Sequence, residues 1–152
     1  MVRAVGAAID IDAAAADVWA VLLDVDRYPE WNPFTVSVMT TFELGSPVDM
    51  RVALRGRRRR DGTFRTMHQV EYVTGFEPGR QLSWGVSVGP SWFIQADRWQ
   101  RLTDLGGGRT RYETSDEFTG VGVGLMLALM RRHMERGFRD VAQALKSRCE
   151  TP

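Results

Sequence analysis

The chain has 152 residues, of which 43% are hydrophobic and 26% charged, the proportions of an ordinary globular protein rather than of a disordered or fibrous one. Its 20 basic and 19 acidic side chains leave a net charge of +1, which argues against the chain as a whole being a binder of polyanions such as nucleic acid. This length predicts one domain, over residues 1–152, that buries about 70% of the surface exposed by the unfolded chain.

Three further features set expectations about location. Cys149 is the only cysteine, so no intrachain disulfide can form, as in many proteins of a reducing cytoplasm. The first residues lack the basic and apolar pattern of a secretory signal. The longest apolar stretch, residues 120–130, is far shorter than the roughly 20 residues that span a bilayer. The sequence therefore predicts a cytoplasmic protein with no stable membrane insertion.

The start of the chain reads as a strand, a helix and a proline-containing connection. Residues 4–11 alternate weakly, and Asp12 is a good N-cap for an alanine-rich helix over residues 12–23. Residues 28–34 read Y-P-E-W-N-P-F, and the two prolines predict that this segment contains no regular helix or central strand. Three large aromatic side chains in so short a segment are expected to cover an apolar surface.

The middle of the chain has the pattern of short strands joined by tight polar turns. Together with residues 4–11, the expected strands are residues 35–42, 48–54, 64–76, 81–88, 91–102 and 110–118. No strand–helix–strand alternation occurs, which excludes a doubly wound parallel sheet. The sequence therefore predicts a seven-stranded antiparallel meander.

A long helix is predicted from residue 121 to the end of the chain. Its apolar side chains recur in one stripe, formed by Leu127, Met130, Met134, Phe138, Val141 and Leu145. At 1.5 Å per residue, about 27 residues make a helix of about 40 Å. Such a helix is long enough to lie across a whole sheet.

This order of elements, with three local motifs, resembles the START/SRPBCC superfamily, which includes lipid-transfer START domains, birch-pollen-allergen-like proteins and polyketide cyclase/aromatases. The motifs are residues 28–34, F-E-P-G-R-Q-L-S-W at 76–84 and G-G-G-R-T-R-Y-E-T-S-D-E-F-T-G at 106–120. The resemblance implies an α+β helix-grip fold, in which a seven-stranded curved antiparallel sheet wraps around a long C-terminal helix. Two short helices near the N-terminus are expected to close one end. It also implies a ligand cavity between sheet and helix, expected to measure a few hundred Å³.

The resemblance nominates residues that line this cavity. Trp31, Asn32 and Phe34 fall in the segment that closes one end of the cavity in relatives. They either line the cavity or plug the core, and Asn32 is expected mainly to bond neighbouring backbone. The other lining candidates are Trp84, Met126 and Met130. The two methionines are explained equally well as adaptable cavity wall or as core.

The polar candidates lie on residues 91–118. Residues 91–102 mix polar and apolar side chains on both faces, and the favoured parity places Arg98 and Gln100 inward. The alternative is an exposed Arg98 beside a bulge. On the next strand, Tyr112 and Asp116 share the face expected to point at the helix, where a buried Asp116 needs a partner such as Arg98. This pair would either serve chemistry or form a structural bridge.

No metal, cofactor or nucleic-acid site is predicted. His68 and His133 lack the companions that a metal site needs, and no nucleophile–histidine set occurs. The arginines at positions 57–60 have no interleaved aromatic residues, so they are interpreted as a solvated hairpin tip.

Two functions remain open. In the first, the protein is a carrier, sensor or sequestering protein for a small hydrophobic molecule, which is lipid- or polyketide-like. In the second, it is a polyketide cyclase-like enzyme in which Arg98, Tyr112 and Asp116 are the catalytic groups. The lack of an unmistakable acid/base set favours the first, and the polar residues at 91–118 favour the second. The oligomeric state stays open.

Overall fold

The computed structural model describes residues 1–151, except for the side chains at positions 55–58 and 64, so the expectation about the arginines at 57–60 falls partly outside the described side chains. In chain order the elements are β1 (Arg3–Ile11), α1 (Ala15–Leu23), the 3-10 helix η1 (Val25–Arg27), α2 (Tyr28–Trp31), β2 (Thr35–Met39), β3 (Pro47–Arg58), β4 (Phe64–Glu77), β5 (Gln81–Val88), β6 (Ile94–Gly106), β7 (Arg109–Thr119) and α3 (Val123–Glu150).

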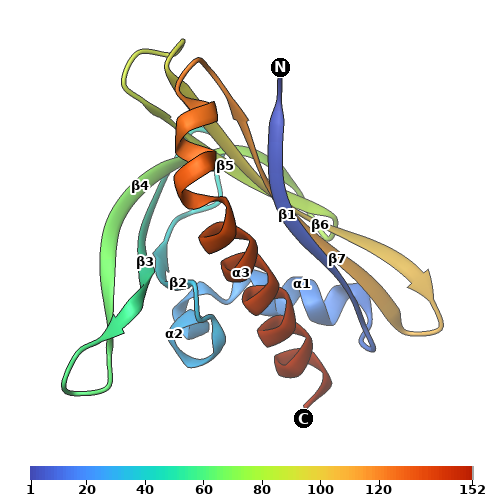
Figure 1. Cartoon of the computed structure of the whole chain (residues 1–152). Coiled ribbons are helices and arrows are strands. Elements are labelled where there is room, and N and C mark those ends of the chain that lie inside the picture. Colours follow the sequence, from blue (N-terminus) through green and yellow to red (C-terminus); the bar gives the residue numbers. More distant parts are fainter. Residues whose placement is uncertain (152) are drawn as a thin grey trace.

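The seven strands form one antiparallel sheet in the order β1-β7-β6-β5-β4-β3-β2. From β2 to β7 each strand pairs with its successor in the chain, and β1 pairs with β7. The sheet curves around α3, and α1 and α2 lie at one end of the molecule (Figure 1). The predicted α+β helix-grip fold, with two short helices near the N-terminus, is confirmed.

The Y-P-E-W-N-P-F segment contains one helical turn, α2, where the prolines predicted no regular helix. Pro29 lies in the first turn, where a missing N–H leaves no hydrogen bond unmade. Asn32 ends the turn, because its Oδ1 accepts hydrogen bonds from the backbone N–H groups of Phe34 (3.0 Å) and Thr35 (2.8 Å). The expectation that Asn32 bonds neighbouring backbone is therefore confirmed.

The long helix α3 packs mainly against β1, with further contacts to β7, α1 and α2. Most of the predicted stripe is buried, namely Leu127, Met134, Phe138, Val141 and Leu145. Met130 is an exception, because 44% of its surface is exposed. The helix is turned so that Leu127 and Met134 face the sheet, and Met130 lies at the margin of the contact.

Phe34 fills the space between the sheet and the middle of α3. Its ring lies 5.7 Å from the ring of Phe138, centroid to centroid. A Cβ placed on Gly137 would be 2.6 Å from two atoms of the Phe34 ring. The absence of a side chain at Gly137 therefore allows Phe34 to lie directly against the helix backbone.

We expect Gly137→Ala to lower the free energy of unfolding by about 1–3 kcal/mol, because the added methyl group forces Phe34 out of its position. The matched control is Gly124→Ala in the same helix, where a Cβ would approach only the tip of the Arg3 side chain, at 3.3 Å. Alanine favours helix over glycine, so this control should be as stable as the wild type or slightly more so. Urea denaturation of the two variants measures the difference. Equal stability of both would show that Phe34 is not held against α3.

Candidate functional site

The inner face of the sheet carries a row of polar side chains on three neighbouring strands. Trp84 on β5 lies directly opposite Arg98 on β6, and Arg98 lies directly opposite Asp116 on β7. Directly paired residues of antiparallel strands point to the same side of a sheet. That side faces α3, since the Arg98 guanidinium lies over the ring of Phe138. Arg98 therefore points toward the helix, as the favoured alternation of residues 91–102 predicted.

Arg98 and Asp116 form a bidentate ion pair. Nε donates to Oδ1 at 2.9 Å, and Nη2 donates to Oδ2 at 3.0 Å. Only 13% and 9% of the two side chains are exposed, so the pair is largely shielded from water. Burial acts against the charged guanidinium, but the charge and hydrogen bonds of Asp116 outweigh it and raise the pKa of Arg98. The sequence suggested Arg98 as the partner of a buried Asp116, and the structure has this pair.

Two aromatic rings complete the surroundings of the Arg98 guanidinium. Its central carbon lies 4.7 Å from the ring centroid of Phe138 and 5.2 Å from that of Phe34, within the range of cation–π attraction. The Nε–H and one Nη2–H are used by Asp116. The remaining donors of this side chain, including both on Nη1, are available to a molecule that enters the space.

A second polar pair, between Tyr112 and Gln100, lies on the same face. The Tyr112 hydroxyl donates to Gln100 Oε1 at 2.8 Å, and both side chains are buried. Burial raises the pKa of Tyr112 above its usual range. The tyrosine is therefore a neutral hydrogen-bond donor at physiological pH.

Glu71 on β4 is a buried carboxyl group that the sequence did not single out. It pairs in register with the fully buried Val48 of β3 and is itself only 6% exposed. Gln69 Nε2 donates a hydrogen bond to its Oε1. Burial raises the pKa of Glu71 to about 7, with Arg98 acting to lower it and Asp116 to raise it. Glu71 can therefore hold or release a proton near neutral pH.

Because of a β-bulge in β4, the alternation of residues in the sequence does not predict which way Glu71 points. Simple alternation along β4 places the apolar Val70 and Phe76 on one face and Glu71 on the other. The register of β4 against β5 shifts between Val73 and Gly75. The bulge changes the parity, so that Val73 and Phe76 both point inward, and Glu71 points inward with Val73.

The Trp84 Nε1–H is a buried donor without a hydrogen-bond partner among the described residues. It borders a space between the sheet and α3 whose other lining residues include Asn32, Phe34, Arg98, Gln100, Tyr112 and Phe138. This space measures about 20 Å³, enough for about one water molecule. The expectation of a cavity of a few hundred Å³ is therefore wrong for this structure. Phe34, Phe138 and the Arg98–Asp116 pair fill the volume.

Three predicted lining residues lie elsewhere. Trp31 borders a separate surface hollow of about 150 Å³ with Arg27 and Arg148. Met126 is half-buried against the core, and Met130 is exposed at the margin of α3. The prediction that Trp31, Met126 and Met130 border one cavity with Trp84 is corrected accordingly. The roles of the predicted site residues in binding or catalysis stay predictions.

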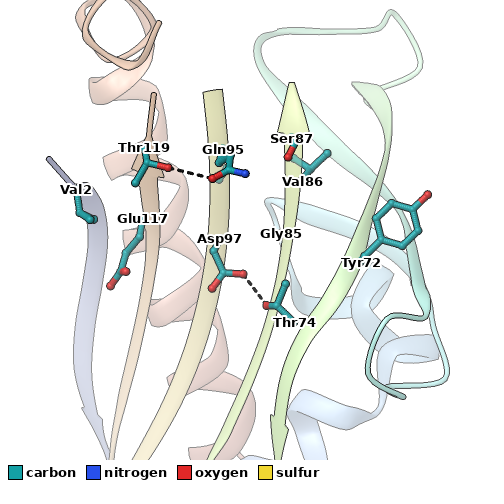
Figure 2. Close-up of a pocket in the computed structure, with 11 residues that line it drawn as sticks. Val2, Tyr72, Thr74, Gly85, Val86, Ser87, Gln95, Asp97, Glu117 and Thr119 are labelled. Atoms are coloured by element: carbon teal, nitrogen blue, oxygen red, sulfur yellow. Dashed lines mark hydrogen bonds between the residues drawn. The ribbon is translucent and has the colours of Figure 1, made fainter. Parts of the chain in front are cut away.

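A hollow of about 630 Å³ lies on the other face of the sheet (Figure 2). It crosses β4, β5, β6 and β7 and is bordered by polar side chains such as Thr74, Asp97 and Glu117. Thr74 Oγ1 donates to Asp97 Oδ1 at 2.6 Å, and Glu117 accepts from Trp99 Nε1 at 2.9 Å. Burial, opposed by Thr74 and assisted by Glu117, raises the pKa of Asp97. None of the predicted site residues lies there.

Within the described part of the chain, no three His, Cys, Asp or Glu side chains come together as a metal site requires. The side chains at the space between the sheet and α3 combine apolar and polar groups. Aromatic rings provide apolar contact, and Trp84 and Arg98 provide donors, whereas the one O–H of Tyr112 is taken by Gln100. Glu71 is not among the residues that line this space, but its carboxyl group, which Arg98 influences, titrates near neutral pH.

Solved structures similar to this chain share its fold. The Zhui aromatase/cyclase of Streptomyces sp. R1128 matches with a TM-score of 0.70 and 19% identity, covering 99% of this chain and 94% of that one. The norcoclaurine synthase of Thalictrum flavum matches with a TM-score of 0.69 and 12% identity, covering 100% and 88%. A START superfamily protein of Mycobacterium smegmatis matches with a TM-score of 0.67 and 16% identity, covering 97% of each chain.

A search of curated proteins finds no match. The family described as "Polyketide cyclase / dehydrase and lipid transport" matches residues 3–150, almost the whole chain. The element order, the curved sheet around α3 and the three sequence motifs agree with that match. The chain is therefore a member of this polyketide cyclase/dehydrase and lipid transport family, within the START/SRPBCC superfamily.

Proposed function

We propose that the protein binds a small, mostly apolar molecule that carries a carbonyl or hydroxyl oxygen, in the space between the sheet and α3, as a carrier, sensor or sequestering protein. The observation that carries this proposal is the unpartnered Trp84 Nε1–H. Buried donors in proteins are nearly always paired, and an unpaired one costs about 1–3 kcal/mol. A ligand oxygen at this position would supply the missing acceptor, and the rings of Phe34 and Phe138 would contact the apolar part.

The inner face of β3 and β4 supports an entrance to this space. Val48, Met50 and Val52 are buried at alternate positions of β3, and Leu54 continues their parity. Met67 pairs in register with Val52 and so shares their face. Leu54 and Met67 are nevertheless 41% and 46% exposed. The apolar inner surface thus continues past the packed core to solvent, as the mouth of a ligand site would.

The space has to widen before such a ligand can enter. Phe34 is the side chain best placed to allow this, because it follows α2 in a connecting segment rather than within a strand. The main contacts of α3 are with β1, at the edge of the sheet, and not with β3 or β4. Rotation of the Phe34 side chain away from Gly137 would therefore enlarge the space and could keep the hydrogen bond from the Ala53 N–H of β3 to the Phe34 carbonyl.

A polyketide cyclase-like enzyme is the second candidate, favoured by Glu71. A carboxyl group with a pKa of about 7 can take a proton from a carbon beside a carbonyl group and return it to oxygen. Arg98 would donate to a carbonyl oxygen as charge develops there, and Asp116 would hold Arg98 in place. Tyr112 would join as a second donor once its O–H turns from Gln100 Oε1 to the substrate. Fixing a flexible chain in a reactive fold can itself lower the barrier by roughly 7–11 kcal/mol. Two of the similar structures are named as an aromatase/cyclase and a synthase.

The test incubates the protein with a panel of oxygenated apolar and polyketide-like molecules, and follows the melting temperature and the recovery of each molecule by mass spectrometry. A molecule that raises the melting temperature and is recovered unchanged indicates a carrier. A new product that Glu71→Gln does not form indicates an enzyme.

Trp84→Phe removes the donor and keeps an aromatic ring, so we expect it to weaken binding about tenfold. The matched control is Trp99→Phe, whose Nε1–H bonds Glu117 on the other face of the sheet. Equal binding by both variants would contradict the role of Trp84. Failure of every molecule in the panel to stabilise the wild type would contradict the proposal itself.

A further inference from the structure

Two connections meet at the end of the molecule where α3 begins, one between β5 and β6 and the other between β7 and α3 (Figure 1). The N–H of Val121 donates to the carbonyl of Trp92 at 3.1 Å, and the N–H of Gly122 donates to that of Phe93 at 3.0 Å. Gly120 has a φ of 118°, and a Cβ there would lie 2.2 Å from the Phe93 carbonyl oxygen. The two connections are therefore joined closely, and with the first turns of α3 they form one surface, here called the α3 tip.

The α3 tip exposes large apolar side chains. Trp92 is 65% exposed, and Val121, Leu125 and Leu129 are 75%, 71% and 78% exposed. Leu125 and Leu129 are four residues apart in α3 and so lie on one side of the helix, and Val121 lies in the turn that leads into it. Buried Val123 and Leu127 lie on the opposite side of the same turns. The start of α3 is thus apolar both toward the core and toward solvent, and an exposed apolar patch of this kind marks an interaction surface.

The charges at the α3 tip are positive. Residues 85–96 and 118–134 contain no aspartate or glutamate, although the chain has 19 acidic residues. Arg131 and Arg132 lie near the end of the second segment, and Arg3 reaches the helix beside Gly124. Together they border a hollow of about 350 Å³ that Leu129 also lines. Arg131 pairs with Glu135 at 3.6 Å, whereas Arg3 and Arg132 have no ion-pair partner among the described residues.

We infer that the α3 tip docks on the surface of an anionic lipid bilayer. Exposed aliphatic side chains and a tryptophan suit the boundary between head groups and acyl chains, and arginines beside them suit lipid phosphates. The association would be peripheral, since none of the described helices combines the length and apolarity needed to cross a bilayer. A second copy of the chain fits less well, because a twofold contact through this surface would bring Arg131 and Arg132 of both copies together.

The test is sedimentation of the protein with vesicles of phosphatidylcholine alone or of phosphatidylcholine and phosphatidylglycerol in equal parts. We expect stronger binding to the anionic vesicles, weakening as salt is raised, because screening reduces the attraction of the arginines. A double variant, Leu125→Ser with Leu129→Ser, should bind about tenfold more weakly or worse. The matched control is Leu44→Ser, which alters an equally exposed leucine (72%) between β2 and β3 and should bind like the wild type.

The arginines are tested by Arg131→Gln with Arg132→Gln, which should reduce binding to anionic vesicles about tenfold and leave binding to neutral vesicles unchanged. Arg109→Gln at the β6–β7 hairpin is the control and should have no effect. A blue shift of tryptophan emission on vesicles, lost in Trp92→Phe, would place Trp92 in the lipid. Melting temperatures equal to that of the wild type show that each variant is folded.

Three results would overturn this inference. The first is the absence of vesicle binding by the wild type. The second is binding that the Leu125/Leu129 double variant retains in full. The third is a dimer in sedimentation velocity that this variant converts to a monomer, which would assign the surface to a second copy of the chain.

Discussion

Replacing Asp116 with alanine is expected to lower the free energy of unfolding by about 3–5 kcal/mol, because the variant leaves the buried charge of Arg98 without its partner. Both hydrogen bonds of the ion pair are lost, and 87% of the arginine side chain stays out of water, given its 13% exposure. For a chain of this length the melting temperature should fall by roughly 10 °C or more. Thermal and urea denaturation measure the effect.

The structure offers a control with the same geometry and a different environment. Arg111 on β7 and Asp10 on β1 also form a bidentate ion pair across neighbouring strands. Arg111 Nε donates to Asp10 Oδ1 at 2.7 Å, and Nη2 donates to Oδ2 at 3.1 Å. Nearly half of each side chain is exposed. Ion pairs exposed to water contribute little, so Asp10→Ala should leave the melting temperature close to that of the wild type. The contrast between the two variants measures what burial adds to an ion pair.

A double variant separates the pair from the charge that it leaves behind. Arg98→Met with Asp116→Leu removes both charges and retains apolar volume, and such replacements are often neutral or stabilising. It should therefore be clearly more stable than Asp116→Ala alone. If the two are equally unstable, the loss comes from packing around Asp116 and not from an unpaired Arg98.

The sequence predicted the inner wall of β6 and β7 correctly because these strands alternate without interruption through the site. Arg98, Tyr112 and Asp116 occupy alternate positions of regular strands, so parity alone placed them on one face. The helix-grip fold was equally accessible, because it follows from the order and number of the elements. These features depend on local periodicity, which a sequence displays directly.

Features that depend on contacts between distant residues could not be predicted. Glu71 was missed because a bulge at Val73–Gly75 reverses the parity of β4, and the apolar pattern alone points to the wrong face. The small volume of the inner space depends on Phe34 lying against Gly137, residues more than a hundred positions apart. No periodicity records such a contact.

Replacing Glu71 with glutamine is expected to change how stability depends on pH. The carboxyl group has a pKa of about 7 in the folded protein against an ordinary value of 4.5. Between these values the folded state keeps a proton that the unfolded chain releases, so the stability of the wild type falls as pH rises from about 4.5 through about 7. At 1.36 kcal/mol per pH unit the loss amounts to about 3 kcal/mol. Glutamine cannot ionise, so the variant escapes this loss and should be the more stable protein above pH 7.

The physical reason is that one cation faces two carboxyl groups in a shielded place. Asp116 takes both hydrogen bonds of the Arg98 pair, so Glu71 gains only a longer-range attraction to Arg98, and the charge of Asp116 opposes its ionisation. Burial adds the largest contribution, and Glu71 therefore keeps its proton to neutral pH. Combining Asp116→Asn with Glu71→Gln leaves Arg98 with neither carboxylate. This double variant should be the least stable of the Asp116 and Glu71 variants.

The measurement is the melting temperature of wild type and Glu71→Gln between pH 4.5 and 8. Their difference isolates Glu71 from the other groups that titrate in this range. Glu43→Gln, which removes an exposed carboxylate between β2 and β3, controls for the loss of one surface charge. A difference between wild type and Glu71→Gln that is the same at pH 5 and pH 8 would contradict a proton held by Glu71. The same variant distinguishes the two proposed functions. A carrier retains ligand binding without Glu71. An enzyme that uses Glu71 loses product formation and the step near pH 7 in its pH–rate profile.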